Sequence, residues 1–125
     1  MVKSDSPQLA RQLAKIIQKK LGEDVVILDL REASPLTDFF IIATASSTVH
    51  ARAIADALCD RSLLKGLNMP HHIEGQENAQ WILLDYFSVI VHIFLAETRE
   101  FYGLERLWGD VPRRSVNADK KGGVV

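Results

Sequence analysis

The clearest pattern of apolar and polar positions lies in the second half of the chain. Two short apolar runs, Trp81–Leu84 and Val89–Leu95, are rich in β-branched and aromatic residues and are too short for buried helices, which predicts two strands. The connector Asp85–Ser88 has the length of a hairpin turn. Because both runs are almost continuously apolar, we expect this hairpin near the middle of a sheet whose two faces are largely covered.

The stretch that follows the hairpin changes period. Between Glu97 and Trp108, charged residues alternate with apolar ones such as Phe101 and Leu104 at helical spacing, around a break at Gly103. The sequence therefore predicts a final helix that is interrupted near its middle.

The first half of the chain predicts a helix followed by two strands. Ser6 and Pro7 suit the start of a helix, and Gly22 suits its end. The apolar runs Val25–Leu30 and Phe39–Ala43 are the expected strands. Because only a short loop joins them, they should pair antiparallel.

A second helix and a polar strand fill the middle of the chain. A serine of the pair Ser46–Ser47 is a good helix cap, and Gly66 is the expected end of that helix. The short run His71–Glu74 reads as a polar strand, and its polarity and the nearby Pro70 place it at a sheet edge.

These elements predict one α+β domain with a mixed five-stranded sheet and helices mainly on one face. The domain is expected to span residues 1–112. The remaining segment, residues 113–125, shows no periodicity and is expected to be a disordered tail. Asp85 and His92 interrupt the longest apolar runs, so no segment has membrane-spanning length. The start of the chain lacks a hydrophobic signal region, so we expect a cytoplasmic protein.

Charge and cysteine content narrow the class of protein. The chain of 125 residues has 15 basic and 16 acidic side chains, a net charge of −1. Proteins that hold nucleic acid through its phosphates usually carry a basic excess, which argues against RNA as the main partner without excluding a local patch. The lysines Lys15, Lys19 and Lys20 fit a solvated helix face better than a nucleic-acid site. The single cysteine, Cys59, cannot form an internal disulfide and fits a reducing compartment.

The histidines give a weak metal signal. His72 and Glu74 would share one face of a strand, and His92 on another strand could approach them. Without a thiolate, or paired histidines at helical spacing, we expect no metal site and no cofactor. Cys59 lies in a helical pattern with no histidine at helical spacing, so we expect it to be structural rather than nucleophilic.

A surplus of aromatic residues is the stronger signal for function. Trp81 and Leu83 should point to one face of their strand, and Ile82 and Leu84 to the other. We expect core positions at Ile82, Leu84, Val91 and Phe94. Core packing and partner binding are equally good readings for Trp81, Tyr86 and Trp108.

Several stretches of the chain resemble the ribosomal silencing factor family, also called the Iojap family. They are TDFFIIATASS, IEGQ, WILLD, VHIF and ETREFYGLERLW, and the resemblance runs from about Leu9 to Pro112. It implies a small domain of nucleotidyltransferase-like topology without catalytic activity. It also implies binding to the large-subunit ribosomal protein uL14, which blocks joining of the two ribosomal subunits and represses translation.

The resemblance also implies where uL14 binds. In silencing factors that surface lies around the late strands and the last helix, and acidic groups there would complement a basic ribosomal protein. The matching candidates are Glu74, Glu77, Trp81, Asp85, Tyr86, Glu105 and Trp108. Where family members often carry Gly-Asp, this chain has Phe87-Ser88, which puts the turn contacts in doubt. A homodimer is a further open possibility.

Two other functions remain as alternatives. An active nucleotidyltransferase would need a pair of carboxylates soon after Ser47 to hold Mg²⁺, and the chain has none there, while Asp29 and Asp85 stand alone. An RNA-binding ribosome assembly factor would be expected to show a basic excess, which is also missing. The sequence therefore favours a non-enzymatic factor.

Overall fold

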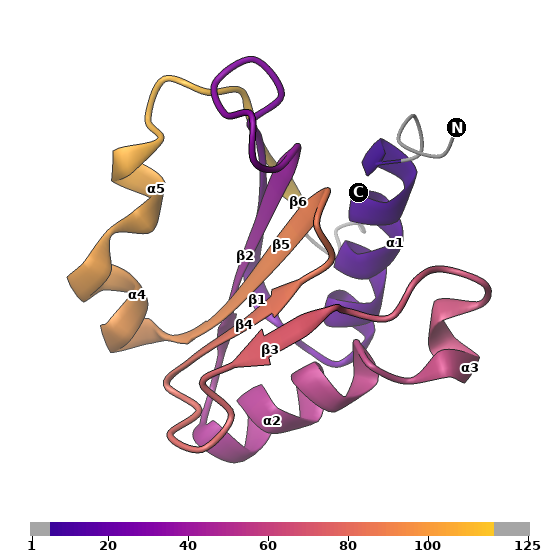
Figure 1. The fold of residues 1–125 in the computed structure, drawn as a ribbon. Coiled ribbons are helices and arrows are strands. Elements are labelled where there is room, and N and C mark those ends of the chain that lie inside the picture. Colours follow the sequence, from indigo (N-terminus) through magenta and orange to yellow (C-terminus); the bar gives the residue numbers. More distant parts are fainter. Residues whose placement is uncertain (1–5, 117–125) are drawn as a thin grey trace, which may run out of the picture.

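The protein is described by a computed structural model covering residues 6–116. This part of the chain forms a single α+β domain with a six-stranded mixed sheet (Figure 1). The predicted fold class is confirmed, and the sheet has one strand more than predicted. The elements in chain order are α1 (Ser6–Lys19), β1 (Glu23–Asp29), β2 (Phe39–Ala45), α2 (Thr48–Ala57), α3 (Arg61–Leu64), β3 (His72–Glu74), β4 (Trp81–Asp85), β5 (Val89–Leu95), α4 (Ala96–Tyr102), α5 (Leu104–Leu107) and β6 (Arg113–Val116).

The strands lie in the order β3-β4-β5-β2-β1-β6. β2 and β5 pair in parallel, and every other neighbouring pair is antiparallel. The predicted antiparallel pair β1–β2, the hairpin β4–β5 and the edge position of β3 are therefore confirmed. The hairpin closes with the amide of Tyr86 donating to the carbonyl of Val89 at 2.8 Å.

The additional strand, β6, comes from a segment that the sequence placed in a disordered tail. Arg113–Val116 pair antiparallel with β1, with Arg113 opposite Leu28 and Val116 opposite Val25. The side-chain amide of Gln18 also donates to the carbonyl of Val116 at 3.0 Å. A short, mostly exposed edge strand is held by backbone hydrogen bonds, so it leaves no apolar periodicity to detect. Residues 117–125 of the expected tail lie outside the described residues.

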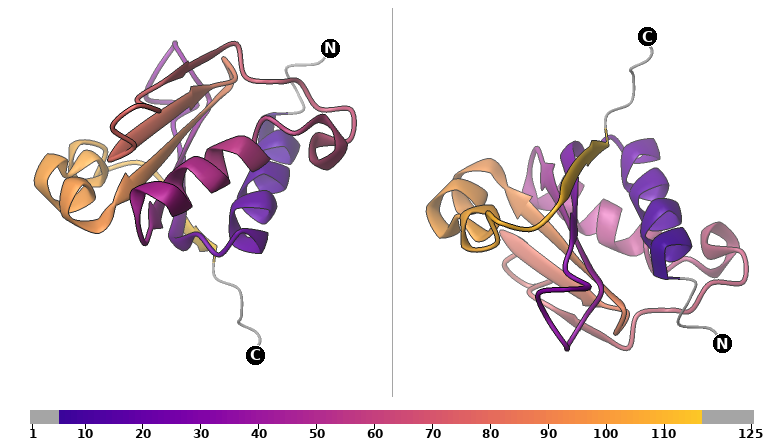
Figure 2. Two further views of the ribbon diagram at one scale, coloured as in Figure 1. Left: turned by 90° about the horizontal axis from the view of Figure 1, so that it is seen from below. Right: turned by 90° about the horizontal axis from the view of Figure 1, so that it is seen from above.

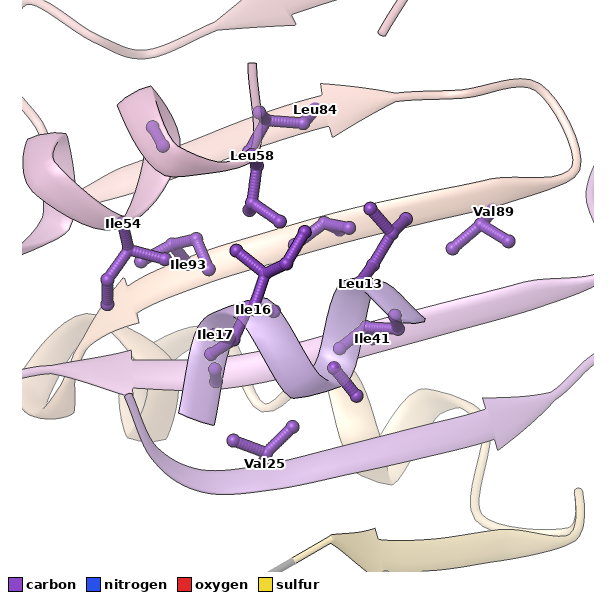
Figure 3. Packing of buried hydrophobic residues seen from close by; sticks show 14 of the residues in the cluster. Leu13, Ile16, Ile17, Val25, Ile41, Ile54, Leu58, Leu84, Val89 and Ile93 are labelled. Carbon is purple, nitrogen blue, oxygen red and sulfur yellow. The ribbon is translucent and has the colours of Figure 1, made fainter. Parts of the chain in front are cut away.

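The helices divide unequally between the two faces of the sheet. α1 and α2 pack on one face and enclose the larger core, while α4 and α5 lie on the other face (Figure 2). Figure 3 shows the larger core from close by, with Leu13 and Ile17 of α1 and Ile54 of α2 directed at the sheet. None of the helices within residues 6–116 is both long enough and apolar enough to cross a lipid bilayer.

The second predicted helix is shorter than expected. Its cap is Ser47, as predicted, whose side chain accepts from the amide of His50. The sequence predicted one unbroken helix up to Gly66. Instead α2 ends at Ala57, and the short α3 begins after its cap, Asp60. The Asp60 carboxylate accepts from the amide of Ser62, a local bond that competes with helix continuation. Cys59 lies in this break and is partly buried.

Candidate partner-binding surface

Strand β4 presents two different faces, as its alternation predicted. Ile82 and Leu84 are fully buried in the core beneath α1 and α2. Trp81, Leu83 and Asp85 point to the opposite face and remain partly exposed. The expected core positions Val91 and Phe94 on β5 are also buried. The face that carries Trp81 is therefore the one with side chains left for a partner.

Trp81 lies at the centre of an aromatic group on this face. Its ring centroid is 4.8 Å from that of Phe94 and 4.9 Å from that of Tyr102. Its indole nitrogen donates to Nδ1 of His92 at 3.1 Å. One edge of the indole is thus fixed inside the protein while the rest of the side chain is partly exposed, which is how an interface anchor is commonly held.

The last two helices contribute the other exposed aromatic and apolar groups. Gly103 adopts a left-handed conformation at φ 57° and separates α4 from α5, as predicted. Tyr102 is 52% exposed at the end of α4, and Leu107 is 75% exposed on α5. Trp108 is partly exposed and meets Phe40 of β2 edge to face at 6.0 Å.

A partly buried arginine holds these helices on the sheet. Arg99 donates from Nε and Nη2 to the two carboxylate oxygens of Glu105, at 2.9 and 3.0 Å. It also donates from Nη1 to the hydroxyl of Thr44 at 2.8 Å and to the carbonyl of Asp24 at 2.9 Å. Arg113 makes a further ion pair with Glu105 at 3.1 Å. The hydrogen bond from Arg99 lowers the pKa of Glu105. Because both arginines bind its carboxylate, Glu105 holds α4 and α5 in place and is already engaged within the protein.

Tyr86 has a different position from the other aromatic candidates. It is 3% exposed and belongs to the larger core. Its hydroxyl donates to the carbonyl of Leu58 at 2.7 Å, and burial raises its pKa. Tyr86 therefore joins the hairpin to the end of α2 and has no side-chain surface to offer a partner.

The acidic candidates separate into two groups. On the Trp81 face, Glu74 lies beside His72, with Oε2 and Nε2 2.6 Å apart, and Asp85 accepts from the amide of Phe87 at 2.7 Å. Glu77 lies in the loop between β3 and β4. Arg52 of α2, on the opposite side of the sheet, donates to the carbonyl of Glu77 at 2.6 Å. Within residues 6–116, Glu74 and Asp85 are thus carboxylates on the Trp81 face that form no ion pair with an arginine.

Two apolar residues that sequence reasoning did not select also belong to this face. Leu83 follows from the same alternation that selected Trp81. Ile90 is partly exposed and is the register partner of Asp85 across the hairpin, a placement that only the pairing reveals. We call the combined set the docking surface: Trp81, Leu83, Asp85, Ile90, Tyr102 and Trp108, with Glu74 at its rim.

His92 lies beneath the docking surface and is 3% exposed. Its Nδ1 accepts from Trp81, while its Nε2 has no hydrogen-bond partner in the part of the chain described. Burial lowers its pKa to about 4. Within residues 6–116, no three His, Cys, Asp or Glu side chains come close enough to hold a metal ion. His92 is therefore a neutral structural histidine that orients Trp81.

The lowered pKa of His92 predicts a loss of stability in mild acid. The unfolded chain, with an ordinary histidine pKa near 6.5, binds a proton before the folded protein does. The free energy of unfolding is therefore unaffected by protonation of His92 above about pH 6.5 and decreases as the pH falls towards about 4. Between about pH 7 and about pH 5 this loss of stability is roughly 2 kcal/mol. Urea unfolding at the two pH values measures this change.

A His92→Gln variant is the matched control, because its amide oxygen can still accept from Trp81 and does not titrate. The carboxylates of Asp29, Asp60 and Glu105 have lowered pKa values, so they stay ionised in this pH range. An equal loss of stability in the variant would assign the pH dependence to another group.

Comparison with known proteins places the chain in a family. The model of the family described as "Ribosomal silencing factor during starvation" matches residues 3–123. A ribosomal silencing factor from Halalkalibacterium halodurans is 35% identical over 105 residues, which cover 84% of this chain and 89% of that protein. A ribosomal silencing factor from Bacillus subtilis is 37% identical over 93 residues, which cover 74% of this chain and 78% of that protein. A crystal structure of a Chromobacterium violaceum protein matches with a TM-score of 0.77 at 27% identity, covering 94% of this chain and 98% of that one. The chain therefore belongs to the ribosomal silencing factor family, and it is a non-enzymatic regulator of translation.

Proposed function

We propose that the protein binds ribosomal protein uL14 through the docking surface and thereby prevents the small ribosomal subunit from joining the large one. Membership of the family supports the ribosome as the partner. The choice of uL14 rests on the resemblance of the late strands and last helix to silencing factors, and on the chemistry of the docking surface.

The observation that carries the proposal is a group of partly exposed aromatic side chains on the same face as two carboxylates that no arginine pairs with. Trp81, Tyr102 and Trp108 lie on one face of the sheet, and the strand register places Asp85 and Glu74 on the same face. Aromatic anchors surrounded by charged groups are the usual composition of an energetic hot spot in a protein interface. The two carboxylates would complement the basic surface that ribosomal proteins commonly present.

The proposed mechanism is occlusion. The docking surface is built on strands β4 and β5 and on helices fixed by Arg99, so it can bind without first becoming ordered. A domain of this size that covers a contact between the subunits blocks their association by its volume, and no chemical step is needed. The proposed site of action is the compartment that holds the ribosomes, which is the cytoplasm in the bacteria of the named relatives.

The proposal is tested in two steps. Purified uL14 and the isolated large subunit are each mixed with the protein, and binding is measured by interferometry and by cosedimentation. Joining of the two subunits is then followed on sucrose gradients. We expect binding to both and fewer joined ribosomes in proportion to the protein added. Binding to the large subunit without binding to uL14 would place the contact on another component.

Removal of the charge on Asp85 should affect the rate of association. An Asp85→Asn variant keeps an oxygen to accept from Phe87 but loses the charge, so we expect a several-fold lower on-rate for uL14, weaker salt dependence and a nearly unchanged off-rate. Stopped-flow or interferometry measures the two rates. Asp56 is an exposed carboxylate on α2, on the side of the sheet opposite the docking surface, so Asp56→Asn is the matched control. Equal effects of the two changes would indicate steering by net charge alone.

A second copy of the chain is the other candidate occupant of the docking surface, since a homodimer could bury the same aromatic groups. Light scattering after size exclusion measures the oligomeric state with and without uL14. If a dimer forms through the docking surface, uL14 should dissociate it, because one surface cannot hold both partners.

A further inference from the structure

The lysines of the described chain gather in one place. Residues 6–116 contain four lysines, and all four line a single groove of about 240 Å³ between α1 and α3. Lys15, Lys19 and Lys20 come from α1 and its end, while Lys65 comes from the end of α3. The fold therefore brings a lysine distant in the sequence to the three that the sequence already places together.

No acidic residue lines this groove, and one carboxylate just outside it, that of Asp60, interacts with the charge of Lys20. The other residues that line it are Gln12, Ile16 and Leu63. Within residues 6–116, no lysine forms an ion pair, whereas Arg31, Arg99 and Arg113 each pair with a carboxylate. α1 contains no acidic residue in Ser6–Lys19. The groove is thus a local concentration of positive charge in a chain whose net charge is −1.

The exposed lysines of the groove repel one another. Lys15 and Lys19 are four residues apart on one helix, where like charges repel. The carboxyl end of α1 offsets part of this repulsion for Lys19 and Lys20. Lys65 lies beyond α3, in a left-handed conformation at φ 48°, so it receives no such compensation from α1. An anion that bridges the two helices would remove the repulsion and be bound more tightly for that reason.

From this geometry we infer that the groove binds the phosphate backbone of RNA. Lysine is a compact point charge suited to phosphate, whereas the planar fork of arginine is suited to bidentate carboxylate pairs. No aromatic residue lines the groove, so bases have nothing to stack on and binding is independent of sequence. The low net charge argues against RNA as the main partner, and this site is a secondary contact.

The position of the groove allows both partners to bind at once. α1 and α3 lie on the side of the sheet opposite α4 and α5 (Figures 1 and 2). RNA in the groove would not cover Trp81 or Tyr102. The inference does not depend on the identity of the protein partner, because its test uses RNA alone.

The test is titration of the full chain into a fluorescein-labelled oligouridylate of about twelve nucleotides, followed by anisotropy. Potassium chloride is varied from about 50 to about 200 mM. If the four lysines contact phosphates, the logarithm of the binding constant should fall with the logarithm of the salt concentration with a slope of about −3. Absence of binding at the lowest salt concentration would overturn the inference.

A Lys15→Gln/Lys65→Gln variant removes one charge from each side of the groove. We expect affinity to fall about tenfold or more and the slope to become shallower by about 1.4. Arg31→Gln/Arg106→Gln removes the same charge from exposed arginines outside the groove and should change affinity much less. Equal losses in the two double variants would show binding to net charge and overturn the groove assignment. Circular dichroism melting verifies that both variants are folded.

A poly-L-glutamate of similar length distinguishes phosphate from carboxylate. We expect it to displace the oligouridylate only weakly at equal charge concentration. Displacement as effective as that by unlabelled RNA would assign the groove to an acidic protein segment and overturn the assignment to RNA.

Discussion

A Trp81→Ala variant should remain folded and should no longer cosediment with the large ribosomal subunit. Loss of a central aromatic anchor commonly costs about 2 kcal/mol or more in binding, roughly a thirtyfold weaker association. The variant should also lose some stability, about 2 kcal/mol, because the indole packs on Phe94 and Tyr102 and donates to His92. The core around α1 and α2 does not include Trp81 and should keep the protein folded.

Two further variants separate binding from stability. Phe94 is fully buried beneath Trp81, so Phe94→Leu should lower stability by about 1 to 2 kcal/mol and leave binding nearly unchanged. Trp81→Phe keeps an aromatic ring but loses the donor to His92, so it should bind better than Trp81→Ala. Cosedimentation and urea unfolding are measured on all three. A folded Trp81→Ala protein that binds normally would move the interface towards Tyr102 and Trp108 on the last two helices.

A Tyr86→Ala variant, unlike Trp81→Ala, should lose much of its folding stability and unfold. Removing a buried aromatic side chain typically costs about 3 to 5 kcal/mol, a large part of the roughly 5 to 15 kcal/mol that stabilises a domain. The change also leaves the carbonyl of Leu58 without its hydroxyl donor. Urea unfolding monitored by circular dichroism measures the loss.

Tyr86→Phe tests whether Tyr86 also serves the partner. It keeps the ring and loses only the hydrogen bond to Leu58, so stability should fall by about 1 kcal/mol and binding to uL14 should not change. A stable Tyr86→Phe protein that binds poorly would mean that the hydroxyl is exposed in the complex and that the hairpin rearranges on binding.

Much of the fold is readable from the sequence because local patterns determine it. The alternation in Trp81–Asp85 separates the buried Ile82 and Leu84 from the partly exposed Trp81 and Leu83. The cap at Ser47 and the break at Gly103 follow from the backbone preferences of single residues. Rare residue types at fixed spacing also made the family recognisable, so the general function could be inferred before the structure.

The strand β6 could not be found in this way. Arg113–Val116 bury little side-chain surface and are held by pairing with β1. Backbone hydrogen bonds depend on the position of the neighbouring strand and only weakly on the identity of the side chains. A pattern of apolar residues therefore misses an exposed edge strand, and only the assembled sheet reveals it.

The candidate site depended on tertiary structure for the same kind of reason. Periodicity tells which residues share a face, but not which element covers that face. Tyr86 and Trp81 are similar in sequence terms, yet Tyr86 is enclosed against the end of α2 while Trp81 stays partly exposed beside Tyr102. Glu105 became a structural group because Arg99 reaches it and Thr44 together. The sequence by itself determined the elements, the two faces of β4 and the family, whereas contacts between residues distant in the chain decided which of those side chains remain free for a partner.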